Sequence, residues 1–124
     1  ASTSNKILVL LNVHYGNGAD AGAAIKLLRG SSEIFIGDAS SSRARVTIGG
    51  LDLTDTNNAI YSMDSASACY LDSPSTTSAT TYKIQVQSYS GDSRELKINR
   101  PSNNANAGYI GRYVSTITAM EVSA

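Results

Sequence analysis

Short segments rich in β-branched residues and tyrosine alternate along the chain with clusters of Gly, Ser, Asn, Asp and Pro. This alternation of strand-forming and turn-forming segments is typical of an all-β sandwich or barrel. We therefore expect one antiparallel β-sandwich domain over residues 1–124, with eight or nine evenly spaced strands. The expected strands are Lys6–Val13, Ala24–Arg29, Glu33–Ile36, Ala44–Ile48, Ala59–Met63, Ala66–Leu71, Thr80–Tyr89, Arg94–Asn99 and Tyr113–Val122.

One of these strands has a clear two-residue period. Tyr82, Ile84 and Val86 alternate with lysine and glutamine, which predicts one buried face and one face in water. A turn cluster, Ser90–Ser93, follows, and the alternation then resumes. The whole stretch Thr80–Asn99 is therefore expected to form an antiparallel hairpin.

The first expected strand is apolar on both faces, because residues 7–11 are all isoleucine, leucine or valine. Much of Val114–Val122 is also apolar. In a small antiparallel sandwich one face of such a strand packs on the opposing sheet, and a neighbouring subunit is the natural cover for the other. We therefore expect a homo-oligomer.

The polar surface is expected to be neutral. The chain has 19 Ser, 10 Thr and 9 Asn, while its 10 Lys and Arg balance its 10 Asp and Glu. Without a basic cluster we expect no binding of nucleic acid and no recruitment to an anionic membrane. The longest apolar run is far shorter than the roughly 20 residues that span a bilayer, so we also expect no membrane insertion.

A glycine pattern offers an alternative from the enzyme class. Gly16, Gly18 and Ala21 follow the first apolar strand with the spacing G-x-G-x-x-A, which in dinucleotide-binding domains opens a helix against a pyrophosphate. No helix-periodic segment follows residue 38, so a parallel sheet would lack its crossover helices. A glycine-rich β-turn explains the same residues, and a small dinucleotide-binding domain is the lesser alternative.

Other reactive residues are few. His14 is the one histidine, and Cys69 lies in an apolar segment, where a free cysteine usually acts as a small buried hydrophobe. Asp52, Asp55 and Asp72 are possible oxygen ligands for calcium, but the D-x-D-x-D-G pattern is absent and ordinary turns also use such residues. We expect no catalytic residue, no metal site and no cofactor.

Most of the chain, from residue 27 to residue 124, carries sequence motifs that resemble those of a known protein family. The motifs are Leu27–Gly30, Gly37–Ala39, Ser42–Arg45, Tyr70–Pro74, Thr76–Gln85, Ile98–Arg100 and Ser115–Val122. In combination they resemble the C-terminal domains of bacteriophage structural proteins, of the tail-fibre or appendage type that marine and cyanobacterial phages carry.

The resemblance implies a jelly-roll-like β-sandwich knob, which forms the C-terminal part of a longer fibre or virion protein. It implies a homotrimer on the virion surface, in a tail fibre or a capsid appendage. The implied role is non-enzymatic adhesion to a host-surface glycan or protein, together with contacts to other virion proteins.

The receptor contacts are inferred from loop composition, because no functional motif of this family maps onto named positions here. Loops on a rigid scaffold can vary without disturbing the core, which favours Leu51–Asn58 and Pro101–Gly111. Amides and a guanidinium group suit sugar hydroxyls, and a tyrosine ring suits stacking. The expected receptor contacts are Asn103, Asn104, Asn106, Tyr109 and Arg112.

Two further functions fit the same sequence. A capsid decoration or virion-assembly domain would use its seven tyrosines and apolar faces for neighbouring subunits and bind no host ligand. A cellular carbohydrate-binding module would share the neutral polar composition.

Overall fold

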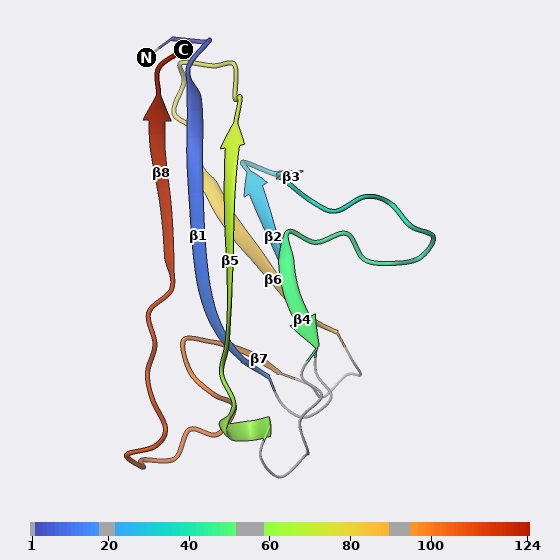
Figure 1. Ribbon diagram of the computed structural model, residues 1–124, viewed down its shortest axis with the longest axis vertical. Coiled ribbons are helices and arrows are strands. Elements are labelled where there is room, and N and C mark those ends of the chain that lie inside the picture. The colour runs from blue at the N-terminus through green and yellow to red at the C-terminus, as the bar shows by residue number, and fades with distance from the viewer. Residues whose placement is uncertain (1, 18–21, 52–58, 90–94) are drawn as a thin grey trace.

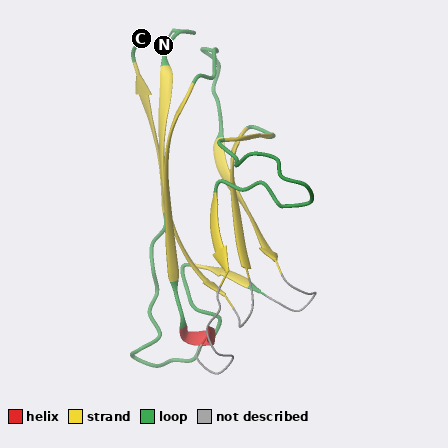
Figure 2. Ribbon diagram, turned by 45° about the vertical axis from the view of Figure 1, so that its right-hand side comes forward, coloured by secondary structure: helices red, strands yellow, loops and turns green. Residues whose placement is uncertain are grey.

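The computed structural model describes residues 2–17, 22–51, 59–89 and 95–124, which form strands, loops and one short 3₁₀ helix. The elements are β1 (Lys6–Asn17), β2 (Gly22–Arg29), β3 (Ser32–Ile34), β4 (Ile48–Leu51), η1 (Ala59–Tyr61), β5 (Asp64–Asp72), β6 (Tyr82–Tyr89), β7 (Leu96–Ile98) and β8 (Thr116–Val122). The strands form two antiparallel sheets that lie face to face (Figures 1 and 2). The expected all-β antiparallel sandwich is confirmed.

Sheet A is built around β1, its longest strand. β5 pairs with one edge of β1 from Ile7 to Tyr15. β8 and β7 share the other edge, with β8 paired to residues 6–12 of β1 and β7 paired to residues 15–17. Figure 1 shows β8, β1 and β5 side by side, with both chain termini at the same end.

Sheet B repeats this plan around β2. β6 pairs with the full length of β2, while β4 and β3 share its other edge. Residues 30–31 connect β2 to β3, and Gly30 adopts a φ of 59° there. Glycine is favoured at this place because a two-residue hairpin turn needs a positive φ.

The core lies between the two central strands. Val9, Leu11 and Val13 of β1 face Ile25 and Leu27 of β2, and all five side chains are almost fully buried. The two-residue period of each strand accounts for this, because alternate side chains point to the same side of a sheet. Burial of each large aliphatic side chain contributes about 1.5–3 kcal/mol to stability.

A buried polar cluster joins the sheets near the end that carries the termini. Arg29 donates hydrogen bonds from Nη1 to both carboxylate oxygens of Asp72, at 2.9 and 3.0 Å, and the Tyr82 hydroxyl donates to Oδ2 at 2.6 Å. Asp72 is the last residue of β5 in sheet A, whereas Arg29 and Tyr82 are register partners in sheet B. A buried carboxylate requires such partners, so this cluster ties one sheet to the other.

The predicted hairpin over Thr80–Asn99 is wrong. β6 pairs with β2 in sheet B, whereas β7 pairs with β1 in sheet A. Leu96 and Ile98 of β7 pack with Ile84 of β6 in the same core cluster. The chain therefore crosses from one layer to the other between the two strands, and their apolar faces meet across the core.

Two further strand predictions change. Ala59–Tyr61 forms η1 in place of a strand, and the Asn103 N–H donates to the Ile60 carbonyl at 2.8 Å. The strand expected at Ala44–Ile48 begins only at Ile48, because the segment before it folds on itself. In that segment the Gly37 N–H donates to the Val46 carbonyl at 3.1 Å.

We predict that Tyr82 makes stability depend on pH in the alkaline range. Partial burial and the hydrogen bond to Asp72 raise the pKa of Tyr82 well above its ordinary value. The folded state therefore holds this proton more tightly than the unfolded state. Its contribution to the free energy of unfolding is complete below about pH 10 and declines as the pH rises above it.

Urea unfolding of Tyr82→Phe at pH 7 and at about pH 11 tests this. At pH 7 we expect a loss of about 1–3 kcal/mol, because Asp72 loses a hydrogen-bond donor. The further loss on raising the pH should be smaller in this variant than in the wild type. Tyr113→Phe is the matched control, since Tyr113 is 40% exposed. An equal alkaline loss in the wild type and Tyr82→Phe would contradict the prediction.

Candidate functional site

The end of the sandwich opposite the termini carries η1 and the long connection from β7 to β8 (Figure 1). This connection, residues 99–115, includes the predicted receptor loop. Three sets of contacts attach it to β1 and η1 and shape its loop.

The first set fixes both ends of the connection to His14 of β1. The Asn99 N–H donates to the His14 carbonyl at 3.0 Å, and the His14 N–H donates to Oγ of Ser115 at 2.9 Å. Ser115 in turn donates from Oγ to Oδ1 of Asn99 at 2.6 Å. Asn99 has a φ of 65°, a conformation that asparagine tolerates better than most residues. The His14 ring also stacks on Tyr113, with ring centroids 5.6 Å apart.

The second set lies at Gly16. A Cβ atom there would come within 2.7 Å of the Arg100 carbonyl oxygen and of the Pro101 Cα atom. Only glycine permits this close approach of the two backbones. Pro101 is fully buried at this contact, so the start of the predicted receptor loop is held against β1.

The third set shapes the loop itself. Besides the bond from the Asn103 N–H to Ile60, the Asn103 side chain accepts the Ala105 N–H at 2.8 Å. The Ile110 N–H donates to the Ala107 carbonyl at 3.0 Å. The loop is therefore held by its own turns and by η1, which gives its exposed side chains defined positions.

Five exposed side chains, one from η1 and four from the connection, form what we call the distal surface: Tyr61, Asn104, Asn106, Tyr109 and Arg112. Tyr109 is 76% exposed, and its ring packs edge to face with that of Tyr61 at a centroid distance of 5.9 Å. The Arg112 guanidinium donates to the side-chain oxygen of Asn104. The distal surface thus offers an aromatic pair together with amide and guanidinium groups.

The structure divides the five predicted receptor contacts. Asn104, Asn106, Tyr109 and Arg112 are exposed, whereas Asn103 is half-buried and stabilises the loop. Tyr61 joins them, and no sequence pattern indicated it, because its place beside Tyr109 depends on the docking of residues 99–115 against η1. In the second predicted loop, Leu51–Asn58, Leu51 is the last residue of β4 and residues 52–58 lie outside the described residues.

A second candidate surface is the outer face of sheet A, meaning Leu8, Leu10, Cys69, Leu71, Met120 and Val122. The register places Leu71 and Met120 on either side of Leu8, and Cys69 beside Leu10. Leu71 and Met120 are 45% and 43% exposed. Contiguous exposed apolar side chains of this kind mark interaction sites.

The prediction that Cys69 is buried is wrong. Its side chain is exposed on the outer face of sheet A. Its neighbours Ala68 and Tyr70 occupy the inward positions of β5 and pack against the core. The two-residue period of the strand therefore turns Cys69 outward.

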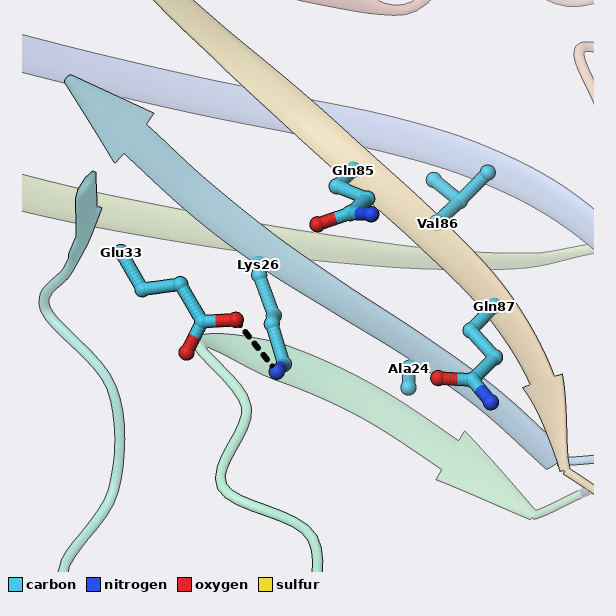
Figure 3. Close-up of a pocket in the computed structure, with 6 residues that line it drawn as sticks. All are labelled: Ala24, Lys26, Glu33, Gln85, Val86 and Gln87. Carbon is cyan, nitrogen blue, oxygen red and sulfur yellow. Dashed lines mark hydrogen bonds and ion pairs between the residues drawn. The ribbon is translucent and has the colours of Figure 1, made fainter. Parts of the chain in front are cut away.

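A shallow hollow of about 150 Å³ lies on sheet B between β2, β3 and β6. Figure 3 shows that Lys26 points to Glu33 within it, and the Lys26 Nζ to Glu33 Oε1 distance is 2.6 Å. Gln85 and Gln87 complete the polar lining. Because the lysine and the glutamate neutralise each other, the hollow presents no unpaired charge from these residues.

The structure bears on the dinucleotide-binding, calcium and membrane-insertion alternatives. β2 is a strand at the place where a dinucleotide-binding fingerprint needs a helix. Asp72 is engaged by Arg29 and Tyr82, while Asp52 and Asp55 lie outside the described residues. Within the described ranges, no cluster of three or more His, Cys, Asp or Glu side chains suits a metal ion, and no helix is long and apolar enough to cross a membrane.

Comparison of the chain with protein-family models, with curated proteins and with solved structures finds no match.

We predict that Ser115 supports the distal surface. Ser115→Ala removes the acceptor for the His14 N–H and the donor to Asn99, so the free energy of unfolding should fall by about 1–3 kcal/mol. Chemical denaturation measures this change, and Ser123→Ala, at an exposed position, is the control. Equal stability of the two variants would show that the Ser115 bonds do not hold the connection.

Proposed function

We propose that this chain is a non-enzymatic domain of a virion surface, at the tip of a tail fibre or appendage, and that it binds a host-surface glycan or protein. The motifs between residues 27 and 124 that resemble bacteriophage structural proteins support the virion assignment. The observation that carries the binding role is the exposed ring of Tyr109, which is supported from one side by Tyr61.

The chemistry of the distal surface suits a receptor rich in hydroxyl or amide groups. A tyrosine ring buries apolar area at little entropic cost while its hydroxyl remains free to bond. Asn104 and Asn106 supply amide donors and acceptors, and Arg112 supplies a fork of donors. The Arg112–Asn104 bond orients the guanidinium without neutralising it.

The same groups support a binding role over a catalytic one. The five side chains of the distal surface include no histidine, carboxylate or thiol, which are the groups that most often act as acid, base or nucleophile in enzymes. Efficient general acid–base catalysis uses groups whose pKa lies near the working pH. We therefore propose that the distal surface binds its receptor without transforming it.

The position of the distal surface favours attachment. It lies at the end opposite both termini (Figure 1), so a shaft joined at either terminus would leave it free. Several copies on one virion would convert weak single contacts into strong adhesion through avidity.

We propose that the domain works as a homotrimer whose subunits meet through the outer face of sheet A. Leu10, Leu71, Met120 and Val122 are each at least 37% exposed. A face of this kind gains free energy when a partner removes it from water. In a closed ring each subunit would offer this face to its neighbours.

The alternative is a capsid decoration or virion-assembly domain without a host ligand. The outer face of sheet A favours it, because the same apolar residues would fit another virion protein. The two functions differ in what the isolated protein binds, since an assembly domain would retain virion proteins and would not adhere to host cells.

We predict that Tyr109→Ala abolishes attachment without changing the mass of the oligomer. The variant removes the exposed ring, and the hydrogen bonds that hold the loop do not involve this side chain. Adsorption of labelled protein to host cells measures the effect. Val114→Ala is the control, because Val114 is 76% exposed and lies outside the distal surface. Unchanged adsorption of Tyr109→Ala would remove the distal surface from consideration.

We predict that Leu71→Asp converts the oligomer into monomers, because a charge would be buried in an apolar interface. Light scattering coupled to size exclusion measures the mass. Val114→Asp is the matched control, since Val114 is 76% exposed and lies outside the outer face of sheet A. A wild-type mass of one chain, or an unchanged oligomer in Leu71→Asp, would rule out this interface.

A further inference from the structure

A groove of about 340 Å³ lies between β8 and the connection from β5 to β6. It is separate from the distal surface, because its lining includes Ile7 and Glu121 near the termini. The groove exists because sheet B does not cover β8. Val9 and Ala119 are register partners on the inner side of sheet A, yet Val9 is 1% exposed whereas Ala119 lies open to solvent.

Part of the groove lining is apolar. Ile7, Pro74, Ala79 and Ala119 contribute aliphatic side chains, and Tyr82 also lines the groove. The size of the groove falls within the range of small-molecule binding sites, about 300–1,000 Å³. Aliphatic side chains beside an aromatic residue suit the C–H face of a compact ligand.

The wall of the groove is rich in hydroxyl groups from residues 76–80. Thr76 Oγ1 accepts the Ser78 N–H at 3.1 Å, and Thr80 Oγ1 donates to the Ser78 carbonyl at 3.1 Å. These two bonds shape the loop. The hydroxyls of Thr77 and Ser78 make no hydrogen bond within the described part of the chain, so they are available to a ligand. A hydroxyl both donates and accepts, as the hydroxyls of a sugar do.

The charge of the groove selects among ligands. Its lining includes the carboxylate of Glu121 and neither lysine nor arginine. Asn5 donates to Oε1 of Glu121 at 2.7 Å, which orients the carboxylate and leaves its other oxygen to accept hydroxyl groups. Phosphates and acidic sugars would meet a like charge here without a compensating cation.

We propose that this groove binds a neutral saccharide unit, with the C–H face of the sugar on Ile7 and Ala119 and its hydroxyls bonded to Thr77, Ser78 and Glu121. The site goes beyond the proposed receptor contact, because it lies on other residues and would bind its ligand independently of Tyr109.

Titration of the ¹⁵N-labelled protein with single sugars tests the proposal. The neutral probes are glucose, galactose, mannose and N-acetylglucosamine, and the acidic probes are glucuronate and N-acetylneuraminate. At least one neutral sugar should shift the amide resonances of Thr77, Ser78 and Ala119 saturably, while neither acidic sugar should. No saturable shift with any neutral sugar, or groove shifts with the acidic sugars alone, would overturn the proposal.

Two variants make the test specific. Ala119→Trp should fill the groove and abolish the shifts, whereas Ala39→Trp, on an exposed loop, should leave them unchanged. Thr77→Val keeps the shape of the side chain but removes its hydroxyl, and it should weaken binding about tenfold, the equivalent of one hydrogen bond. Wild-type affinity in both groove variants would overturn the assignment.

These experiments distinguish failure of the groove proposal from failure of the proposed receptor-binding function. If neutral sugars shift only residues 101–112, the groove proposal fails and the distal receptor surface gains support. If the groove shifts appear and Tyr109→Ala adsorbs to cells normally, the groove proposal holds and the distal surface fails.

Discussion

The structure depends on β1, a strand with apolar side chains on both faces. Its inner face is covered by β2, and this contact makes the core around Val9, Leu11 and Val13. Its two edges hold all other strands of sheet A in place. On its outer face Leu10 is 37% exposed and Leu8 is half-buried. The same strand therefore organises the fold and carries part of the apolar face on which the proposed subunit interface rests.

The sequence predicted the fold class and the central strands because their periodicity reflects burial directly. The predicted hairpin was wrong for a physical reason. Alternation shows which side chains face the core, but it does not show which strand is the hydrogen-bonded neighbour. The apolar residues of β7 pack on the core from a position beside β1, and alternation alone does not distinguish this position from one beside β6. Cys69 was misplaced because an apolar segment was interpreted as buried on both faces, although Tyr70 already indicates which face is inward.

The candidate surfaces were predictable only in part. Loop composition identified Asn104, Asn106, Tyr109 and Arg112, because residues without a role in the core are exposed wherever the loop lies. It could not identify Tyr61 or the structural role of Asn103, since both depend on the docking of residues 99–115 against η1. The groove could not be predicted at all, because it depends on sheet B ending short of β8. These surfaces lie on different parts of the molecule, so one copy could use them at the same time.

The shared edge of β1 has a consequence for how this domain can change. β7 leaves β1 beside Tyr15, and β8 returns to it beside Asn12, so residues 99–115 begin and end at nearby points on one rigid strand. Lengthening such a loop costs little free energy of loop closure, about 0.6 kcal/mol for each doubling of the loop length. The length and sequence of the connection can therefore change at little cost to the stability of the two sheets. Evolution or design could replace residues at its tip while the anchors at His14 and Gly16 keep the scaffold unchanged.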